Sequence, residues 1–305
     1  MRRALALTTS TRRRAAAAVA ALSLAAGGVL AAGLAAPARP SASPARPVLA
    51  ADSIPAGLTR VTGFGPNPGG LQMYAYVPAT ARAGAPLVVA LHGCAQDAAG
   101  YYRGSGWPKY ADQWGFDLLF PQQSLAGNAA GCFDWWTPSD DRRGGGEAES
   151  IMEMIRYMRA THPISGGRTY ITGVSAGGAM AADLLADYPD VFAGGAVDSG
   201  PPAQCATTVA AALGCALGTV RNSPAQWGAL ARAADPGYTG PYPKVAIWQG
   251  TADPVVNVAN AADGMEQWTN LWGIGQIPSG TQALTGGTAE TSYDGPGGTP
   301  WSRPT

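Results

Sequence analysis

The pentapeptide Gly173-Val174-Ser175-Ala176-Gly177 has the residue types and spacing best suited to chemistry in this chain. G-x-S-x-G is typical of a strained turn between a strand and a helix, which raises the serine hydroxyl above the sheet. The flanking glycines are needed because a Cβ at either position would meet the neighbouring strand and helix. Ser175 is therefore predicted to be a nucleophile for acyl transfer.

A serine nucleophile needs an acid that follows it in the chain, at the carboxyl end of a later strand. Asp253 fits, because it comes shortly after a predicted strand at Val245–Trp248. Its role would be to orient a histidine and stabilise the imidazolium. Asp198, which ends the preceding predicted strand, is the competing acid, and either aspartate would also suit an ordinary loop or helix cap.

The oxyanion of a tetrahedral intermediate needs two backbone N–H donors, one from the residue after the nucleophile and one from an upstream loop. Ala176 supplies the first. The turn His92-Gly93-Cys94 follows a predicted buried strand, and we predict the N–H of Cys94 as the second donor.

The general base is missing from the pattern. The sequence has two histidines, His92 and His162, and both precede Ser175. His92 belongs to the oxyanion loop, where its ordinary role is to fix the turn, and His162 follows a predicted helix, where a helix-terminal role is expected. No histidine follows Asp253, so no catalytic histidine is predicted in this chain.

These residues must be positioned by alternating strands and helices, which predict an α/β fold with a mostly parallel sheet and flanking helices. The predicted strands are Leu71–Val77, Leu87–Leu91, Phe116–Phe120, Thr169–Thr172, Ala193–Val197 and Val245–Trp248. The predicted helices are Pro108–Trp114, Glu147–Arg159, Ala179–Tyr188 and Ala259–Trp272.

Composition excludes several classes of protein. The chain has 305 residues, of which 46% are hydrophobic and 13% charged, which suits a globular core and disfavours a nucleic-acid binder. Residues 1–51 hold seven arginines and no acid, so the remainder carries a net charge of −7. That sign gives no general attraction to nucleic acids or anionic membranes. We find no dinucleotide or phosphate loop and no metal-ligand pattern, so neither cofactor nor metal is expected.

The N-terminus reads as a secretory signal peptide, with arginines followed by the apolar stretch 15–36 and then small residues and prolines. A membrane anchor is the alternative, although alanine and glycine insert weakly and no second span follows. We assign residues 1–50 to the signal peptide and spacer and 51–305 to the catalytic domain. Export makes the protein extracellular and its four cysteines candidates for disulfides, with three possible pairings.

Several motifs together resemble the extracellular polyhydroxybutyrate depolymerase family, whose relatives include secreted feruloyl and acetylxylan esterases. The resemblance runs from about Leu58 to about Asp294, and its start and the segment Gln267–Gln276 favour short-chain-length polyhydroxyalkanoate depolymerases. The motifs are ALHGC (Ala90–Cys94), SGW (Ser105–Trp107), CFDWW (Cys132–Trp136), GEAESI (Gly146–Ile151), TGVSAGGAM (Thr172–Met180), YPDVFAGG (Tyr188–Gly195) and WQGTAD (Trp248–Asp253).

The resemblance implies an α/β-hydrolase fold with Ser175 as nucleophile and Asp253 as acid. It also implies the disulfides Cys94–Cys132 and Cys205–Cys215. The expected function is a secreted, monomeric serine esterase that acts on a solid polyester or another ester polymer through an acyl-enzyme. Aromatic rims are expected around the cleft, with Trp107, Trp135, Trp136 and Trp248 as candidates.

In the family, a further strand and a histidine-bearing turn come next, whereas this chain ends in Trp301–Thr305 without either. We therefore expect a C-terminally truncated or frameshifted hydrolase domain, altered near Pro300, that is nearly inactive and less stable than full-length relatives. Two alternatives stay open: a feruloyl or acetylxylan esterase of plant cell walls, and a non-catalytic polymer-binding remnant. A protease is the least favoured, because no protease-specific signal is present.

Overall fold

The computed structural model describes residues 54–295. The predicted signal peptide and spacer lie outside the described residues, as do residues 296–305, so these two predictions stay untested.

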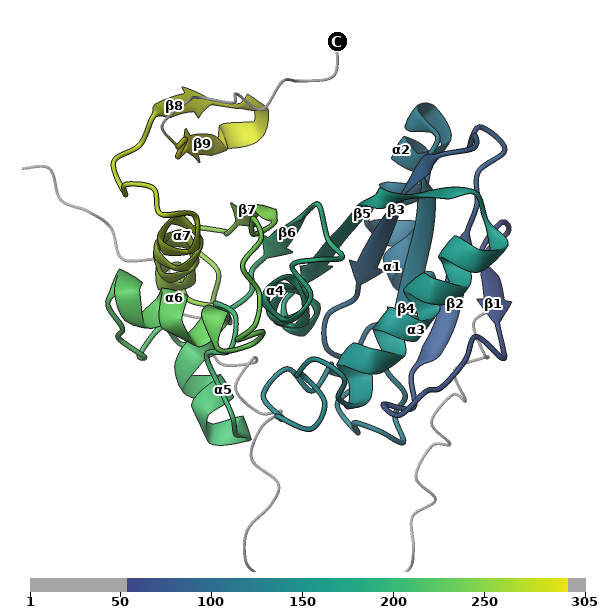
Figure 1. Cartoon of the computed structure of the whole chain (residues 1–305), viewed down its shortest axis with the longest axis horizontal. Coiled ribbons are helices and arrows are strands. Elements are labelled where there is room, and N and C mark those ends of the chain that lie inside the picture. Colours follow the sequence, from purple (N-terminus) through teal and green to yellow (C-terminus); the bar gives the residue numbers. More distant parts are fainter. Residues whose placement is uncertain (1–53, 296–305) are drawn as a thin grey trace, which may run out of the picture. The chain divides into compact units, whose positions relative to one another are not determined.

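Seven strands form one mixed sheet in the order β1-β2-β4-β3-β5-β6-β7 (Figure 1). The pairs β1–β2 and β2–β4 are antiparallel, and all later pairs are parallel. The predicted α/β class with a mostly parallel sheet is therefore confirmed. The strands are β1 (Thr59–Val61), β2 (Gln72–Tyr76), β3 (Ala85–Leu91), β4 (Asp117–Gln122), β5 (Ile164–Val174), β6 (Gly194–Asp198) and β7 (Lys244–Trp248).

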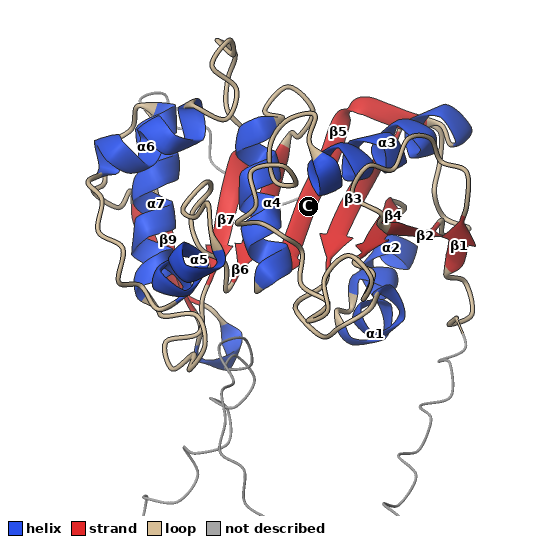
Figure 2. Cartoon of the chain, turned by 90° about the horizontal axis from the view of Figure 1, so that it is seen from below, coloured by secondary structure: helices blue, strands red, loops and turns tan. Residues whose placement is uncertain are grey.

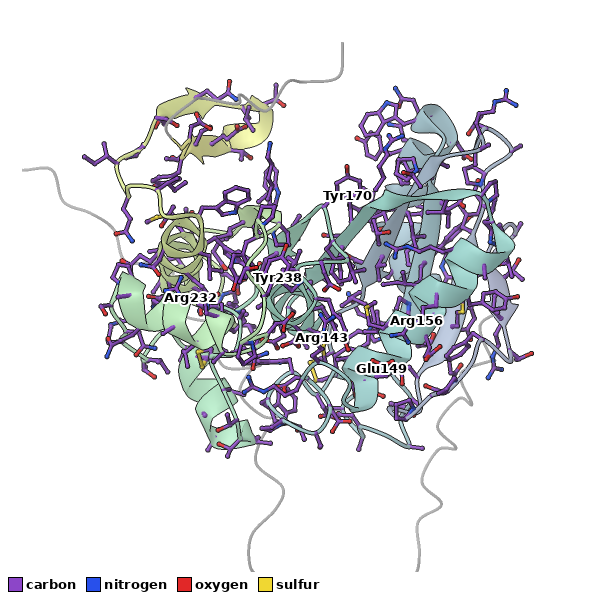
Figure 3. The ribbon with its side chains drawn as sticks, in the orientation of Figure 1. Arg143, Glu149, Arg156, Tyr170, Arg232 and Tyr238 are labelled. Carbon is purple, nitrogen blue, oxygen red and sulfur yellow. A yellow bond between two sulfur atoms is a disulfide. The ribbon has the colours of Figure 1, made fainter. Side chains whose placement is uncertain are left out.

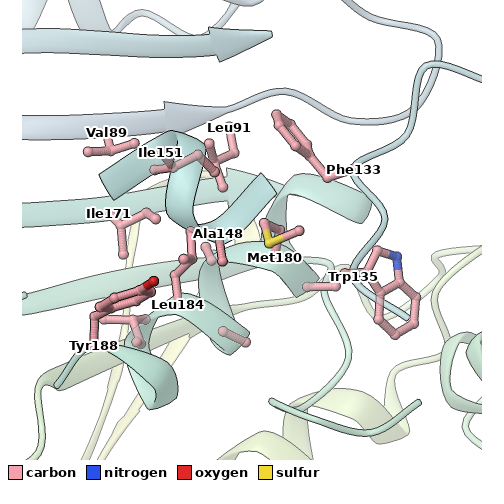
Figure 4. Close-up of a cluster of buried hydrophobic side chains, with 14 of the residues drawn as sticks. Val89, Leu91, Phe133, Trp135, Ala148, Ile151, Ile171, Met180, Leu184 and Tyr188 are labelled. Atoms are coloured by element: carbon pink, nitrogen blue, oxygen red, sulfur yellow. The ribbon is translucent and has the colours of Figure 1, made fainter. Parts of the chain in front are cut away.

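Helices cover both faces of this sheet, because the central strands are apolar on both sides. In β3, Leu87, Val89 and Leu91 pack in a core with α3 and α4, while Val88 and Ala90 pack with α1 and α2 (Figures 2 and 4). The helices are α1 (Ala98–Gly104), α2 (Trp107–Trp114), α3 (Gly146–Thr161), α4 (Ala176–Asp187), α5 (Val209–Ala216), α6 (Pro224–Arg232) and α7 (Ala259–Trp272).

The elements that were not predicted have weak sequence patterns. α1 and α5 consist mostly of small residues, and every residue of α5 is apolar or glycine, so neither shows a polar face at helical spacing. α6 begins with a capping box at Ser223 and Gln226, a sequence pattern from which this helix could have been predicted. A separate hairpin of β8 (Gly280–Ala283) and β9 (Ala289–Ser292) encloses the short 3₁₀ turn Thr285–Gly287.

A buried acidic cluster joins α4, which carries Asp183 and Asp187, to the loop before α3, which carries Asp141. Asp141, Asp183 and Asp187 are each at most 1% exposed, and Gln204 donates its backbone N–H to Asp183 Oδ1 at 2.6 Å. Burial raises the pKa of Asp141 to about 7. Burial also raises the pKa values of Asp183 and Asp187 well above the ordinary value of an aspartate, and the negative charge of Asp141 raises both further. Arg143, which bonds the Asp187 carbonyl, lies on this side of the sheet, whereas Tyr170 lies on the other (Figure 3).

Candidate active site

Ser175 occupies the sharp turn between β5 and α4 that the sequence predicts. It has φ 57° and ψ −121°, a conformation that costs energy for any residue with a side chain. A Cβ added to Gly173 would lie 2.1 Å from the Gly177 carbonyl oxygen, and one added to Gly177 would lie 2.4 Å from the His92 carbonyl oxygen. Only glycine fits at either position, as the motif requires.

The predicted oxyanion loop lies directly against this turn. A Cβ added to Gly93 would be 3.4 Å from Ser175 Cβ and 3.3 Å from the Val174 carbonyl oxygen. Ala176 opens α4, so its N–H is at the positive end of the helix dipole. Among residues 54–295, no hydrogen-bond acceptor engages the N–H of Ala176 or of Cys94. The arrangement leaves both donors available to a developing oxyanion.

A disulfide and a backbone hydrogen bond tie this loop to the segment that follows β4. Cys94 is bonded to Cys132, and Ala95, with φ 58°, donates its N–H to the Ala130 carbonyl at 3.0 Å. The second disulfide joins Cys205 to Cys215. Both pairings that the family resemblance implied are confirmed.

His92 fixes the loop from inside. Its Nε2 accepts the backbone N–H of Gln123 at 3.1 Å, so the ring proton must be on Nδ1, which donates to the Gly93 carbonyl at 2.8 Å. The ring is 1% exposed, and this burial lowers the pKa of His92 despite the bond to Gly93. Because both nitrogens are engaged in the neutral form, His92 is not placed to take the Ser175 proton.

His162 lies at the other end of the sheet. It caps the C-terminus of α3, as predicted, directly before β5 begins at Ile164. Ser175 follows the other end of that strand, which pairs with β3 from Ala85 to Leu91 and so spans about 20 Å at about 3.3 Å per residue of β3. The distance excludes His162 as a base for Ser175.

Asp253 is held by its own loop. Its Oδ1 accepts backbone N–H groups from Val255 at 2.8 Å and Val256 at 3.0 Å, and its Oδ2 lies 3.3 Å from Gln249 Nε2. Partial burial alone would raise the pKa of Asp253, but these donors outweigh it and hold the pKa below its ordinary value. The side chain is an ionised, oriented carboxylate at neutral pH.

Asp198, the competing acid, differs in its electrostatics. Burial raises its pKa, and the negative charge of Asp253 raises it further, against a hydrogen bond of 3.2 Å from the Ser199 hydroxyl. Its main chain serves the nucleophile, because the N–H of Ser175 donates to the Asp198 carbonyl at 2.9 Å. Of the two candidate acids, Asp253 has the lowered pKa and Asp198 the raised one.

Comparison with known proteins decides the family. A family described as "Esterase PHB depolymerase" matches residues 71–292. The chain belongs to the esterase PHB depolymerase family. It is 46% identical over 243 residues to poly(3-hydroxyalkanoate) depolymerase C of Paucimonas lemoignei, which covers 80% of this chain and 58% of that protein. The chain thus spans less than two thirds of that depolymerase.

Relatives that act on other esters are also close. Feruloyl esterase B of Talaromyces funiculosus is 35% identical over 247 residues, which cover 79% of this chain and 69% of that enzyme. Acetyl xylan esterase from Aspergillus awamori superposes with a TM-score of 0.73 at 30% identity, over 78% of this chain and 89% of that chain. These similarities confirm the α/β-hydrolase fold that the sequence resemblance implied.

Three residues of this family member support the site without having been predicted to do so. Gln123 bonds His92, and its Nε2 donates to the Cys132 carbonyl at 3.1 Å and to Glu147. Glu147, whose pKa burial raises to about 8, also accepts the Asp134 N–H at 2.9 Å. Ser199, with φ 47°, lies between the two candidate acids. Glu147 stands in the motif GEAESI, which could have drawn attention to it.

The predicted aromatic rim is partly wrong. Trp135 is 5% exposed and packs against the partly buried Trp136 in the core. Trp107 and Trp136 are half-buried, and Trp248 at the end of β7 is 48% exposed. Of the four candidates, Trp248 alone is freely accessible within residues 54–295.

Two further features concern ions and membranes. Within residues 54–295, no group of three or more histidine, cysteine or acidic side chains is arranged to hold a metal ion. None of the helices in that range combines the length and apolar character needed to cross a bilayer.

Proposed function

We propose that this chain is a secreted serine esterase domain that hydrolyses aliphatic polyesters of 3-hydroxy acids. The observation that carries the proposal is the strained turn at Ser175, against which the loop bearing the Cys94 N–H is packed. The polyester substrate is favoured over other esters because the depolymerase is 46% identical, compared with 35% for the feruloyl esterase.

In the proposed reaction, the Ser175 hydroxyl attacks the ester carbonyl as a base removes its proton. The tetrahedral oxyanion accepts the N–H groups of Ala176 and Cys94, and its collapse releases the alcohol end of the chain, which takes up the proton. Water, which gives a proton to the base, then attacks the acyl-enzyme; the fragment with the new carboxyl end leaves, and Ser175 regains its proton. Asp253 orients the base, and neither His92 nor His162 is placed to be that base.

The test uses imidazole to supply the base. Hydrolysis of p-nitrophenyl butyrate by the 305-residue chain is measured with and without imidazole, in wild type and Ser175→Ala. Loss of a triad base costs a serine hydrolase on the order of 10⁶ in kcat, so we expect slow hydrolysis that imidazole accelerates. Ser175→Ala should abolish the imidazole-dependent part. Equal rates in wild type and variant would refute the role of Ser175.

A plant cell-wall esterase is the second candidate, and the feruloyl and acetylxylan esterase relatives favour it. The two are separated by giving the imidazole-supplemented chain poly(3-hydroxybutyrate), feruloylated xylan and acetylated xylan. Soluble 3-hydroxybutyrate supports the polyester assignment, whereas release of ferulate or acetate alone supports the second candidate. Adsorption to polymer without any ester cleavage by any preparation would favour a polymer-binding protein.

A further inference from the structure

The helix α5 presents its apolar residues to solvent. Val209, Leu213 and Leu217 are 59%, 47% and 48% exposed, and their spacing of four residues places them on one side of the helix. Surface helices normally carry polar residues on the exposed side. A contiguous apolar patch on a folded surface marks a place where another surface binds.

The patch is held rigidly. Cys215, on the buried side of α5, is bonded to Cys205, and the Thr208 hydroxyl caps the helix by accepting the Ala211 N–H at 3.2 Å. Because the backbone is fixed at both ends, covering the patch requires little further ordering of the backbone.

This patch adjoins the loop of the proposed catalytic acid. The Ala216 carbonyl at the end of α5 accepts the N–H of Asn257 at 2.8 Å and the side-chain amide of Asn260 at 3.1 Å. Val255 and Val258, on either side of Asn257, are 60% and 45% exposed. We call the exposed set of Val209, Leu213, Leu217, Val255 and Val258 the α5 apolar surface. It begins two residues after Asp253.

The composition of this region indicates the chemistry of its partner. Residues 199–220 and 254–262 contain no charged residue and no aromatic residue. Asp198, Arg221, Asp253 and Asp263 border these segments, but within them an ionic partner finds no counter-charge and a polysaccharide finds no ring on which to stack. An uncharged aliphatic surface, by contrast, gains from covering aliphatic side chains.

We propose that the α5 apolar surface is the face by which the protein adsorbs to a solid aliphatic polyester. The proposal rests on the proposed function for its choice of polymer. Adsorption there places the polymer beside the Asp253 loop, so the surface chains are held near the site.

Adsorption to poly(3-hydroxybutyrate) film tests the proposal, measured by depletion from solution with the full chain. The variant Val209→Ser/Leu213→Ser/Leu217→Ser should weaken adsorption about tenfold through lost apolar burial. A matched control, Ile54→Ser/Val77→Ser/Ile277→Ser, replaces three aliphatic residues that are 46%, 42% and 86% exposed elsewhere. The control should adsorb like wild type.

Equal adsorption by the α5 variant and wild type would overturn the proposal, as would equal losses in variant and control. Tighter adsorption of wild type to acetylated xylan than to polyester would show that the chosen partner is wrong. Leu213→Ser alone should give a smaller loss in the same direction, which covers the case of a poorly folded triple variant. Adsorption does not require catalysis. If Ser175→Ala hydrolysed as fast as wild type, the proposed function would be refuted, whereas the adsorption result would be unaffected.

Discussion

The two sides of the candidate site are held in place by different kinds of contact. On the nucleophile side, segments far apart in sequence hold Ser175 and the Cys94 loop. The backbone packs closely at Gly173 and Gly177, a disulfide joins Cys94 to Cys132, and the buried His92 ring accepts the Gln123 N–H. On the acid side, Asp253 is held by residues between Gln249 and Val256. The nucleophile geometry therefore depends on the whole fold, whereas the acid geometry depends mainly on one loop, with the Ser199 hydroxyl as a contact from outside it.

The disulfides give the largest test of this comparison, because each side has one. Cys94–Cys132 spans 38 residues and Cys205–Cys215 spans 10, so removing them should cost about 4 and about 3 kcal/mol of unfolding free energy. Paired serine variants are compared by urea unfolding and by imidazole-dependent esterase activity. Loss of Cys94–Cys132 should reduce activity more than loss of Cys205–Cys215, even where both variants remain folded. Equal activities would show that the oxyanion loop does not need its disulfide.

Gly177→Ala tests the close packing on the nucleophile side. The new Cβ would lie 2.4 Å from the His92 carbonyl oxygen and 2.5 Å from that of Leu91, so we expect a loss of about 3 kcal/mol or more in urea unfolding. Gly104→Ala is the matched control, because nothing lies within 4 Å of its added Cβ at the end of α1. It should be neutral or slightly stabilising. Similar losses in both variants would contradict the packing argument.

Asp253→Asn tests the acid side, where we expect activity to fall with only a small loss of stability. An asparagine oxygen can still accept the Val255 and Val256 N–H groups, but the variant lacks the acceptor for Gln249 and the charge that orients a base. Imidazole-dependent hydrolysis should therefore fall about tenfold or more. Asp198→Asn should have the smaller effect, because the pKa of Asp198 is raised. The reverse order of the two variants would transfer the acid role to Asp198.

The stability contributed by the buried acidic cluster at α4 and that contributed by Asp253 should change with pH in opposite directions. The raised pKa values of Asp141, Asp183 and Asp187 contribute stability that is complete below about pH 4 and lost as the pH rises to about 7 and beyond. The lowered pKa of Asp253 contributes stability above about pH 4 that is lost as the pH falls through its folded value.

Asp183→Asn gives the smallest expected effect. The amide oxygen can still accept the Gln204 N–H, and the cluster has one buried carboxyl fewer to ionise, since Asp141 and Asp187 remain. Its melting temperature should exceed that of wild type by about 2–4 °C at pH 8 and match it at pH 4. An increase in melting temperature of the same size at both pH values would show that the variant is stabilised by packing and not by the loss of an ionisable group.

Sequence patterns predict the nucleophile and the oxyanion loop better than they predict the buried residues that hold that loop in place. The G-x-S-x-G motif and the His92-Gly93 turn both come from short, chemically constrained segments, and the structure brings them together. Gln123 and Glu147 could not be predicted, because their roles exist only once β4 and α3 pack beside the Cys94 loop. Trp135 illustrates the same limit, since a tryptophan in a loop motif does not reveal which way its ring points.

Backbone hydrogen bonds join the ends of three neighbouring strands in series. Ser175 donates to the Asp198 carbonyl at the end of β6, and Ser199 donates to the Trp248 carbonyl at the end of β7. The backbones of the strand that leads to the nucleophile and the strand that leads to the acid loop are therefore two strand spacings apart, about 10 Å. The Ser175 and Asp253 side chains reach into this gap from the two sides, so it leaves room for an imidazole ring between them. The strand spacing of the sheet thus contributes to the width of the site.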